Sequence, residues 1–131
     1  MRPPTIKSLQ KKVWKLVSEC IRREEKGVCF TCGKTKDWKK MDCGHFIHQA
    51  KTSSLAYERK ILHCQCVSCN QYNSGNLLEY TTKMVRLHGL RQVEKWKTEA
   101  RKPYKWKMSE LEELVKFWKE RLESIIEQYE K

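Results

Sequence analysis

The spacing of apolar side chains predicts four helices. Over residues 5–26, apolar positions recur every three or four residues between lysines and arginines, which is the period of an amphipathic helix. The same period predicts a second helix over 76–88 and a third from 90 to 100, closed by a following proline. A last helix is expected over 109–130. The chain is therefore expected to be mostly helical.

The last predicted helix carries two further signals. Ser109 and Glu112 have the spacing of a capping box, which predicts that the helix begins there. Its apolar residues follow a heptad seam. They are Leu111, Val115, Trp118, Leu122, Ile125 and Tyr129. Such a seam packs either on the helices of its own chain or on a second copy, and the sequence leaves both alternatives open.

Residues 28–70 have no helical period and contain the remaining structural signals. The segments 41–47 and 60–65 suit two short strands, which predicts a hairpin. The polar stretch 49–54 is expected to be an exposed loop between them.

Charge divides the chain into two parts. Residues 1–107 hold a net charge of +15 and residues 108–131 hold −3, out of a total of +12 over 131 residues. We therefore treat 1–107 as the main body, with a basic helical region at its end, and 108–131 as an amphipathic helix and a candidate dimerisation element. A basic body predicts a nucleic-acid partner, bound with strong salt dependence, although a generic basic surface is the alternative. With no signal peptide and no apolar span, a cytoplasmic location is expected.

The seven cysteines include two C-x-x-C pairs. In a reducing compartment, such pairs are typical of a structural zinc site with four thiolates. The predicted ligands are Cys29, Cys32, Cys66 and Cys69. Cys43 and Cys64 are competing ligands, and Cys20 lies on an apolar helix stripe, which predicts a buried thiol.

A second group of polar residues lies within and just after this region. Asp42 and Asn70 offer oxygens of the kind that Mg²⁺ or Mn²⁺ prefers, and His45 is a candidate base for activating water. Together they are the parts needed to hydrolyse a phosphodiester with one metal ion. The alternative is that His45 is a structural histidine and Asn70 a helix cap.

Cations and aromatic residues form the expected DNA-binding surface. Lysines around the hairpin would position a duplex near the metal, and rings between cations would stack on an unpaired base. The alternative places the tryptophans in the core. The candidate contacts are Lys34, Lys36, Lys39, Lys40, Asn76, Arg101, Lys102, Tyr104, Lys105, Trp106 and Lys107.

The order of these motifs resembles a known family of nucleases. The segments are Cys29-Phe30-Thr31-Cys32, Asp42-Cys43-Gly44-His45, Cys66-Val67-Ser68-Cys69-Asn70 and Ser74-Gly75-Asn76. This order is similar to the HNH-type ββα-metal finger, and especially to the phage endonuclease VII arrangement, in which zinc knuckles bracket a catalytic hairpin. It most resembles the Rap/NinG family of phage recombination proteins, over roughly residues 8–95.

The resemblance implies a zinc-stapled ββα-metal (HNH-like) finger flanked by helices. The implied function is a metal-dependent DNA endonuclease that cleaves branched recombination intermediates such as a Holliday junction or a D-loop. It would use structural zinc and catalytic Mg²⁺ or Mn²⁺ and, if phage-encoded, work in the host cytoplasm. Because a four-way junction has approximate two-fold symmetry, paired cuts favour a homodimer. The alternatives are a zinc-finger DNA-binding protein without chemistry, or an HNH endonuclease without branch preference.

The family pattern also implies roles for individual residues. His45 would be the general base and Asn70 a metal ligand. The family often has a ligand directly before the base, where this chain has Gly44. Asp42, two residues earlier and on the same strand face, is expected to fill that gap directly or through water.

A second departure lies before the second knuckle. The family's central asparagine falls on Ile61, so the usual hydrogen-bond anchor of the loop is missing. His63 is close enough in sequence to contribute instead, and a structural strand histidine is the competing interpretation. His48 is a secondary candidate, expected to contact phosphate.

Overall fold

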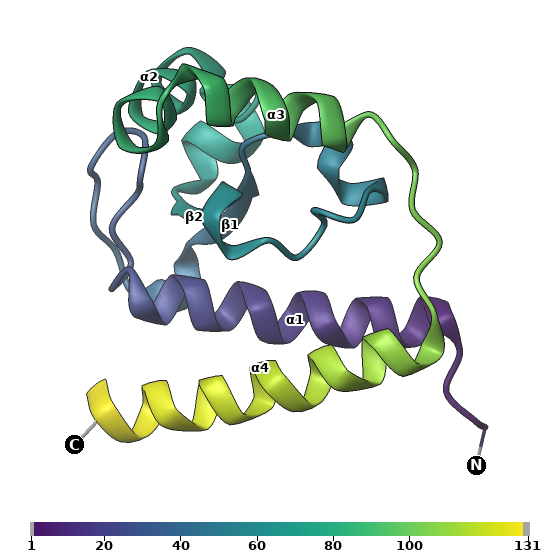
Figure 1. The fold of residues 1–131 in the computed structure, drawn as a ribbon. Coiled ribbons are helices and arrows are strands. Elements are labelled where there is room, and N and C mark those ends of the chain that lie inside the picture. The colour runs from purple at the N-terminus through teal and green to yellow at the C-terminus, as the bar shows by residue number, and fades with distance from the viewer. Residues whose placement is uncertain (1, 130–131) are drawn as a thin grey trace.

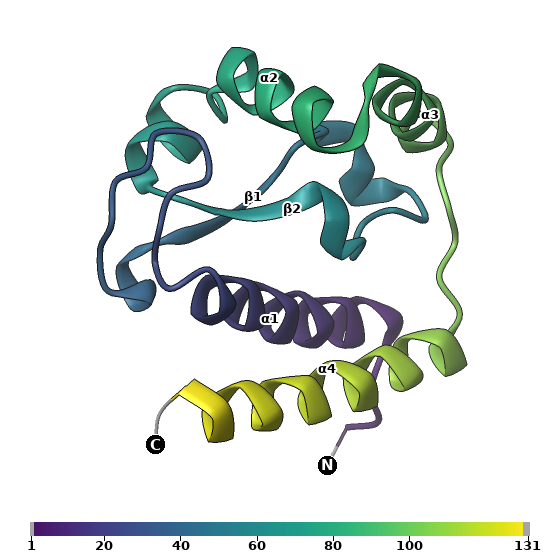
Figure 2. The ribbon, with the colours of Figure 1, turned by 60° about the vertical axis from the view of Figure 1, so that its left-hand side comes forward.

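In the computed structural model, which describes residues 2–129, a short hairpin lies between two pairs of helices (Figure 1; Figure 2). In chain order, the elements are α1 (Ile6–Glu24), β1 (Asp42–His45), β2 (Leu62–Gln65), α2 (Leu77–His88), α3 (Leu90–Ala100) and α4 (Met108–Tyr129). Helices α1 and α4 cover one side of the hairpin, and α2 and α3 cover the other. The predicted mostly helical architecture with a small hairpin is confirmed.

Helix α1 begins as its sequence predicts. The Thr5 and Ser8 side chains form a reciprocal capping box with each other's backbone. The helix ends at Glu24, two residues before the predicted end, and the chain turns through Gly27 in a left-handed conformation (φ 69°). A Cβ on Gly27 would overlap with the Lys36 carbonyl, so glycine is required for this close approach.

The hairpin is antiparallel and shorter than predicted. Asp42 pairs with Gln65, Cys43 with Cys64, and Gly44 with His63. The segment 49–54, predicted to be an exposed loop, contains a 3-10 turn at His48–Thr52. The prediction of exposure was wrong for part of this segment, because Ala50 packs in the α2–α3 core and Ser53 bonds to its own loop.

Helix α4 begins one residue before the predicted cap. Its first residue is Met108, and the Glu110 carboxylate accepts the backbone N–H of Lys107 at 2.9 Å. The predicted capping box was therefore wrong, because Ser109 is already helical and Glu110 reaches back to the residue before the helix. The predicted end of this helix at Glu130 lies outside the described residues.

The apolar seam of α4 packs on α1, and the two helices run in the same direction (Figure 1). The Cys20 thiol donates to the Trp118 carbonyl at 3.6 Å, and Arg121 pairs with Glu24 at 2.7 Å. The seam residues Leu111, Trp118 and Ile125 are buried there, and the Tyr129 side chain lies outside the description. The predicted buried state of Cys20 is confirmed.

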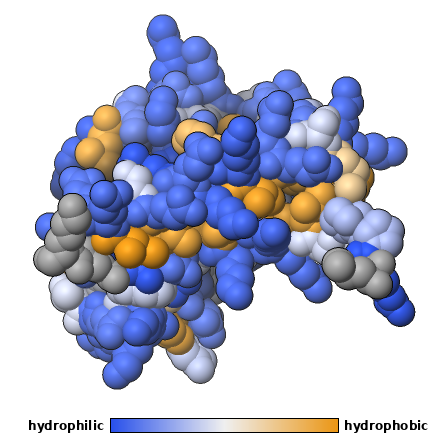
Figure 3. Space-filling model, turned by 90° about the horizontal axis from the view of Figure 1, so that it is seen from below, coloured by the Kyte–Doolittle hydropathy of each residue, from blue (hydrophilic) through white to orange (hydrophobic). Residues whose placement is uncertain are grey.

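An apolar band remains visible on the face that α1 and α4 form (Figure 3). Phe117 is 57% exposed and Ile126 is 36% exposed. The seam itself is occupied within the chain. The homodimer through this helix is not tested by the structure of one chain and stays a prediction. Among the described residues, no helix combines the length and apolarity that a membrane crossing needs.

Candidate functional site

Two cysteine pairs lie close together, one in the loop between α1 and β1 and the other directly after β2. The sulfurs of Cys29, Cys32, Cys66 and Cys69 lie within 4.8 Å of one another. Cys32 Sγ and Cys66 Sγ are 3.7 Å apart, which matches the edge of about 3.8 Å expected for a zinc tetrahedron with bonds of ~2.3 Å. The four predicted ligands therefore form a group that fits zinc, and Cys43 and Cys64 lie outside it.

The groups around Cys29 favour its thiolate form, whereas burial raises the pKa of Cys66. Burial opposes ionisation of Cys29, but the Thr31 hydroxyl at 3.3 Å and nearby backbone N–H groups lower the pKa of this thiol to about 6. The backbone N–H of Cys69 donates to Cys66 Sγ at 3.4 Å, and Asn76 Nδ2 donates to Cys69 Sγ at 3.6 Å. Asn76, predicted as a DNA contact, thus supports a zinc ligand.

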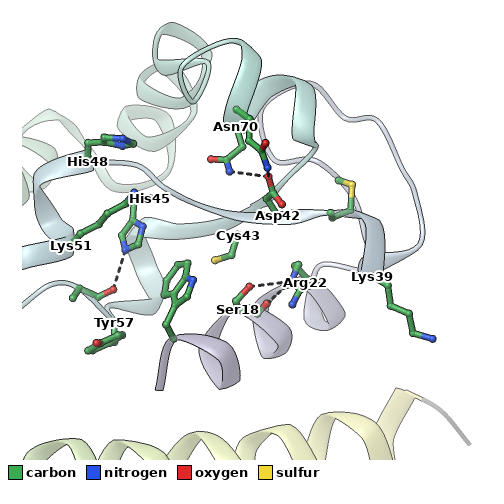
Figure 4. Close-up of a pocket in the computed structure, with 14 residues that line it drawn as sticks. Ser18, Arg22, Lys39, Asp42, Cys43, His45, His48, Lys51, Tyr57 and Asn70 are labelled. Carbon is green, nitrogen blue, oxygen red and sulfur yellow. Dashed lines mark hydrogen bonds between the residues drawn. The ribbon is translucent and has the colours of Figure 1, made fainter. Parts of the chain in front are cut away.

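A cavity of about 670 Å³ lies between α1, β1 and the helical turn Ser68–Tyr72 (Figure 4). Helix α1 contributes Trp14, Ser18 and Arg22 to its wall. The predicted residues Asp42, His45, His48 and Asn70 also border the cavity. The fold thus gathers the second predicted group of polar residues around one pocket.

His45 is held with one nitrogen available as a base. Its Nε2 lies 3.1 Å from the Ala56 carbonyl, and its ring stacks on Trp14 with 4.7 Å between centroids. Because a carbonyl only accepts, Nε2 carries the hydrogen and Nδ1 keeps its lone pair. Burial, with the positive charges of Lys51 and His48, lowers the pKa of His45 to about 4 although the Ala56 bond opposes this. His45 is therefore neutral at neutral pH.

Asp42 and Asn70 are in direct contact. Asp42 Oδ2 accepts from Asn70 Nδ2 at 3.0 Å and from Gln71 Nε2 at 2.7 Å (Figure 4). Since the Asn70 nitrogen is occupied, its Oδ1 remains the free acceptor. These oxygens suit a hard cation such as Mg²⁺. Asp42 and His45 leave β1 on opposite faces, and both border the cavity.

The loop that presents the Ala56 carbonyl has an anchor that the sequence analysis missed. Ser53 is fully buried, and its hydroxyl donates to the Ala50 carbonyl at 2.9 Å and accepts the Leu55 N–H at 3.0 Å. Ile61, where the resemblance places an asparagine, is buried in the apolar core instead. Ser53 thus anchors this loop through its hydroxyl. A single serine in a polar stretch of sequence gives no distinctive signal for such a role.

A buried tyrosine fixes the strand that carries the site. Tyr80 lies on α2, and its hydroxyl donates to the Gly44 carbonyl at 2.9 Å. Tyr80 lies within the helix predicted over 76–88, and nothing in the sequence indicates the role of its hydroxyl. Its hydroxyl links α2 to β1 directly before His45.

The two secondary histidines lie in different surroundings. His48 is exposed at the border of the cavity. His63 Nδ1 lies 2.7 Å from Glu25 Oε2, and its ring stacks on Phe30 with 3.8 Å between centroids. Among the described residues, His63 does not border the cavity, so its contacts favour the structural interpretation.

Cations surround the pocket. Lys39 borders it as predicted, and Arg22 and Lys51 border it without having been predicted. Arg22 is oriented by its bonds to Ser18 and to the Trp38 carbonyl. The other predicted lysines near the hairpin are exposed, namely Lys34, Lys36 and Lys40. Among the residues that the structure describes, Asp42 is the one carboxylate that borders this cavity, and the surrounding cations make it suitable for a phosphate backbone.

The aromatic-basic stretch before α4 is divided between surface and core. Tyr104 is exposed and donates its hydroxyl to Glu110 Oε2 at 2.6 Å. Trp106 is half-buried against Tyr57, with ring centroids 5.4 Å apart, so its ring packs inside the fold. The predicted cations of this stretch are all exposed, namely Arg101, Lys102, Lys105 and Lys107.

Residues 4–128 match the family model described as bacteriophage lambda NinG protein. The chain belongs to the NinG family. It is 27% identical over 116 residues to protein ninG of Salmonella phage P22, and 26% identical over 116 residues to protein ninG of Escherichia phage lambda. Each alignment covers 88% of this chain.

The chain spans just over half the length of these NinG relatives, 56% in both cases. No solved structure matches it. The family model covers the cysteine cluster, the pocket and α4 alike, so the predicted limit of the resemblance at residues 8–95, without the last helix, was wrong.

Proposed function

We propose that this NinG-family chain is a metal-dependent DNA endonuclease that cleaves branched recombination intermediates. One observation carries the proposal. A neutral His45, fixed by the Ala56 carbonyl, borders the same basic cavity as the Asp42–Asn70 oxygen pair. A base, an oxygen site for a hard cation and cations for phosphate are the three parts that phosphodiester hydrolysis needs.

The residues take distinct roles. His45 Nδ1 accepts a proton from the attacking water. Asp42 and Asn70 would hold Mg²⁺ or Mn²⁺, and the bound ion would supply positive charge for the scissile phosphate and the leaving oxygen. Arg22 and Lys51 hold the phosphate backbone at the border of the cavity.

The element order supports the ββα-metal assignment. Strands β1 and β2 are followed at once by the helical turn Ser68–Tyr72, which carries Asn70. The zinc cluster joins the segment before the hairpin to the start of this turn. That order is the one the resemblance implies, with His45 on the first strand and Asn70 on the helical turn.

Branch preference rests on the resemblance, and a cleavage assay tests it together with the activity. A labelled four-way junction and a linear duplex of the same sequence would be incubated with Mg²⁺, Mn²⁺ or EDTA. We expect metal-dependent nicking near the branch, faster than on the duplex. Binding without nicking in either ion would leave a non-catalytic zinc-containing DNA-binding protein. Equal cutting of both substrates would leave a general HNH endonuclease.

The junction's approximate two-fold symmetry makes a homodimer the expected active form. Sedimentation of the free protein and of its junction complex would measure the number of copies. One copy on a resolved junction would contradict the dimer and leave the chemistry untouched.

The basic surface continues from the cavity along α1. Lys7 and Lys11 are exposed, and steps of three or four residues place them on the same helix face as Trp14 in the cavity wall. Replacing Lys7 and Lys11 with alanine is expected to weaken junction binding and to lower the salt slope of log K by about 2, one unit for each lost phosphate contact.

The matched control removes two lysines elsewhere. Lys12 is exposed on another face of α1, and Lys119 is exposed on the acidic α4. Their double alanine variant should keep the wild-type salt slope in the same fluorescence-anisotropy titration. Equal slopes for the two double variants would show that DNA does not follow this face of α1.

A further inference from the structure

Gln65 is a fully buried amide whose oxygen has no protein partner among the described residues. It ends β2, its exposed fraction is 0%, and Oε1 accepts no hydrogen bond. Its Nε2 donates to the Gly75 carbonyl at 2.9 Å and to Thr31 Oγ1 at 3.1 Å. Since the Gly75 carbonyl only accepts, the amide cannot be reversed. An unpaired buried oxygen costs about 1–3 kcal/mol, so a partner for it is expected.

The oxygen of Gln65 lies over Gly44, beside the Asp42–Asn70 pair. A Cβ on Gly44 would overlap with Gln65 Oε1 and would lie 3.0 Å from Asn70 Oδ1. Gln65 is also the register partner of Asp42, so the two side chains share one face of the hairpin. Gln65 Oε1 and Asn70 Oδ1 therefore converge on the same small region. Two convergent carbonyl oxygens without a donor favour a cation or its bound water.

The backbone of Gly44 does not itself require glycine. The glycines with left-handed φ are Gly27, Gly33, Gly75 and Gly89. Gly44 lies in a paired strand, where any side chain is compatible with the backbone. The space taken by the Gln65 amide, with Asn70 Oδ1 close beside it, is what excludes a side chain at position 44.

We propose that Gln65 Oε1 is a third oxygen ligand of the divalent cation, directly or through a bound water. It would supply, from the neighbouring strand, the ligand that Gly44 cannot carry. This assignment rests on the proposed function, because it adds a ligand to the Asp42–Asn70 site. It also explains why an amide rather than an apolar side chain is buried at position 65.

The same amide connects the cation site to the cysteine cluster. Thr31 Oγ1 lies 3.3 Å from Cys29 Sγ and 3.1 Å from Gln65 Nε2. When Cys29 is a thiolate, it accepts the Thr31 hydroxyl, whose oxygen then accepts the Gln65 N–H. The hydrogen bond from Gln65 Nε2 to Thr31 thus joins the Gly75 carbonyl in holding the amide in one orientation.

Mn²⁺ binding to the zinc-loaded protein tests the assignment without relying on cleavage. Free Mn²⁺ would be measured by electron paramagnetic resonance during titration of wild type and of Gln65→Met, which keeps the volume and removes the oxygen. We expect the affinity of Gln65→Met to fall about 10–100-fold, as for other supporting groups of metal sites. Zinc content and melting temperature would be measured in parallel.

A pair of double variants keeps the test decisive if Gln65→Met folds poorly. Gly44→Asp with Gln65→Ala opens the space and moves the oxygen ligand to position 44, so Mn²⁺ affinity should return to at least the wild-type value. Gly44→Ala with Gln65→Ala opens the same space without a ligand and should bind Mn²⁺ weakly. Equal affinities for the two double variants, or wild-type affinity for Gln65→Met, would overturn the role of Gln65. An absence of Mn²⁺ binding in wild type would overturn the proposed function as well.

Discussion

Replacing His45 with alanine is expected to slow DNA cleavage by about 10²–10⁴-fold, the range that a general base contributes. The neutral ring, with Nε2 held by the Ala56 carbonyl, keeps Nδ1 ready to accept a proton at neutral pH. Alanine removes that group and leaves the cysteine cluster and the surrounding cations in place. Single-turnover cleavage of a labelled junction in Mg²⁺ would measure the effect.

His48→Ala is the matched control for His45→Ala. His48 is exposed at the border of the same cavity, and no described side chain orients it. Its loss should change junction affinity slightly and leave the rate of the bound complex close to wild type. Zinc content and junction affinity of the His45 variant should equal those of wild type. A His45 variant that cleaves at the wild-type rate would remove His45 from the mechanism.

Removing zinc is expected to unfold the centre of the protein. Metal binding by four thiolates contributes on the order of 10 kcal/mol to folding in small zinc modules. Here the four sulfurs join the turn after α1 to the end of β2 and to the helical turn that carries Asn70. Loss of the metal would free all three segments at once. Chelation under reducing conditions, followed by circular dichroism and thermal melting, would measure the loss.

Cys20→Ala is the control for this prediction. Cys20 is buried between α1 and α4, and burial raises the pKa of its thiol to about 12. The variant should keep one zinc ion per chain, whereas Cys29→Ser should lose it. A chelated protein with an unchanged melting temperature would contradict a structural role for zinc.

The helices and the four grouped cysteines could be predicted because their signals are local. An amphipathic period and a C-x-x-C spacing are properties of residues close together in the sequence, so both can be recognised without knowledge of the tertiary structure. The ends of helices were less certain. At α4, the backbone N–H of Lys107 is bound by Glu110 and not by Glu112. Both residues have the same type of side chain, so the sequence does not tell which of them binds; the direction in which the chain enters the helix decides it.

The supports of the site could not be predicted, because they depend on contacts between distant segments. The Ala56 carbonyl that fixes His45 is eleven residues away in the chain. The hydrogen bonds of Ser53 form only when its loop is folded, so its role as an anchor cannot be seen in the sequence. Gln65 and Gly44 are informative only as a pair across the hairpin. The sequence marks Gly44 as a departure from the family pattern, and only the structure shows that the Gln65 amide occupies the space beside it.

The heptad seam of α4 illustrates a further limit. An apolar stripe of this period has the same appearance whether it packs within a chain or between chains. The structure places Leu111, Trp118 and Ile125 against α1. The periodicity therefore predicted which residues of α4 are buried, but it did not predict which helix they pack against.

A crystal of the zinc-loaded protein soaked in Mn²⁺ would test the central claim most directly, through anomalous scattering recorded above and below the manganese edge. The account predicts a manganese peak beside Asp42 and Asn70 Oδ1 on the border of the His45 cavity, separate from a zinc peak among the four cysteine sulfurs. A zinc peak at the cysteines with no manganese at Asp42 and Asn70 would contradict it.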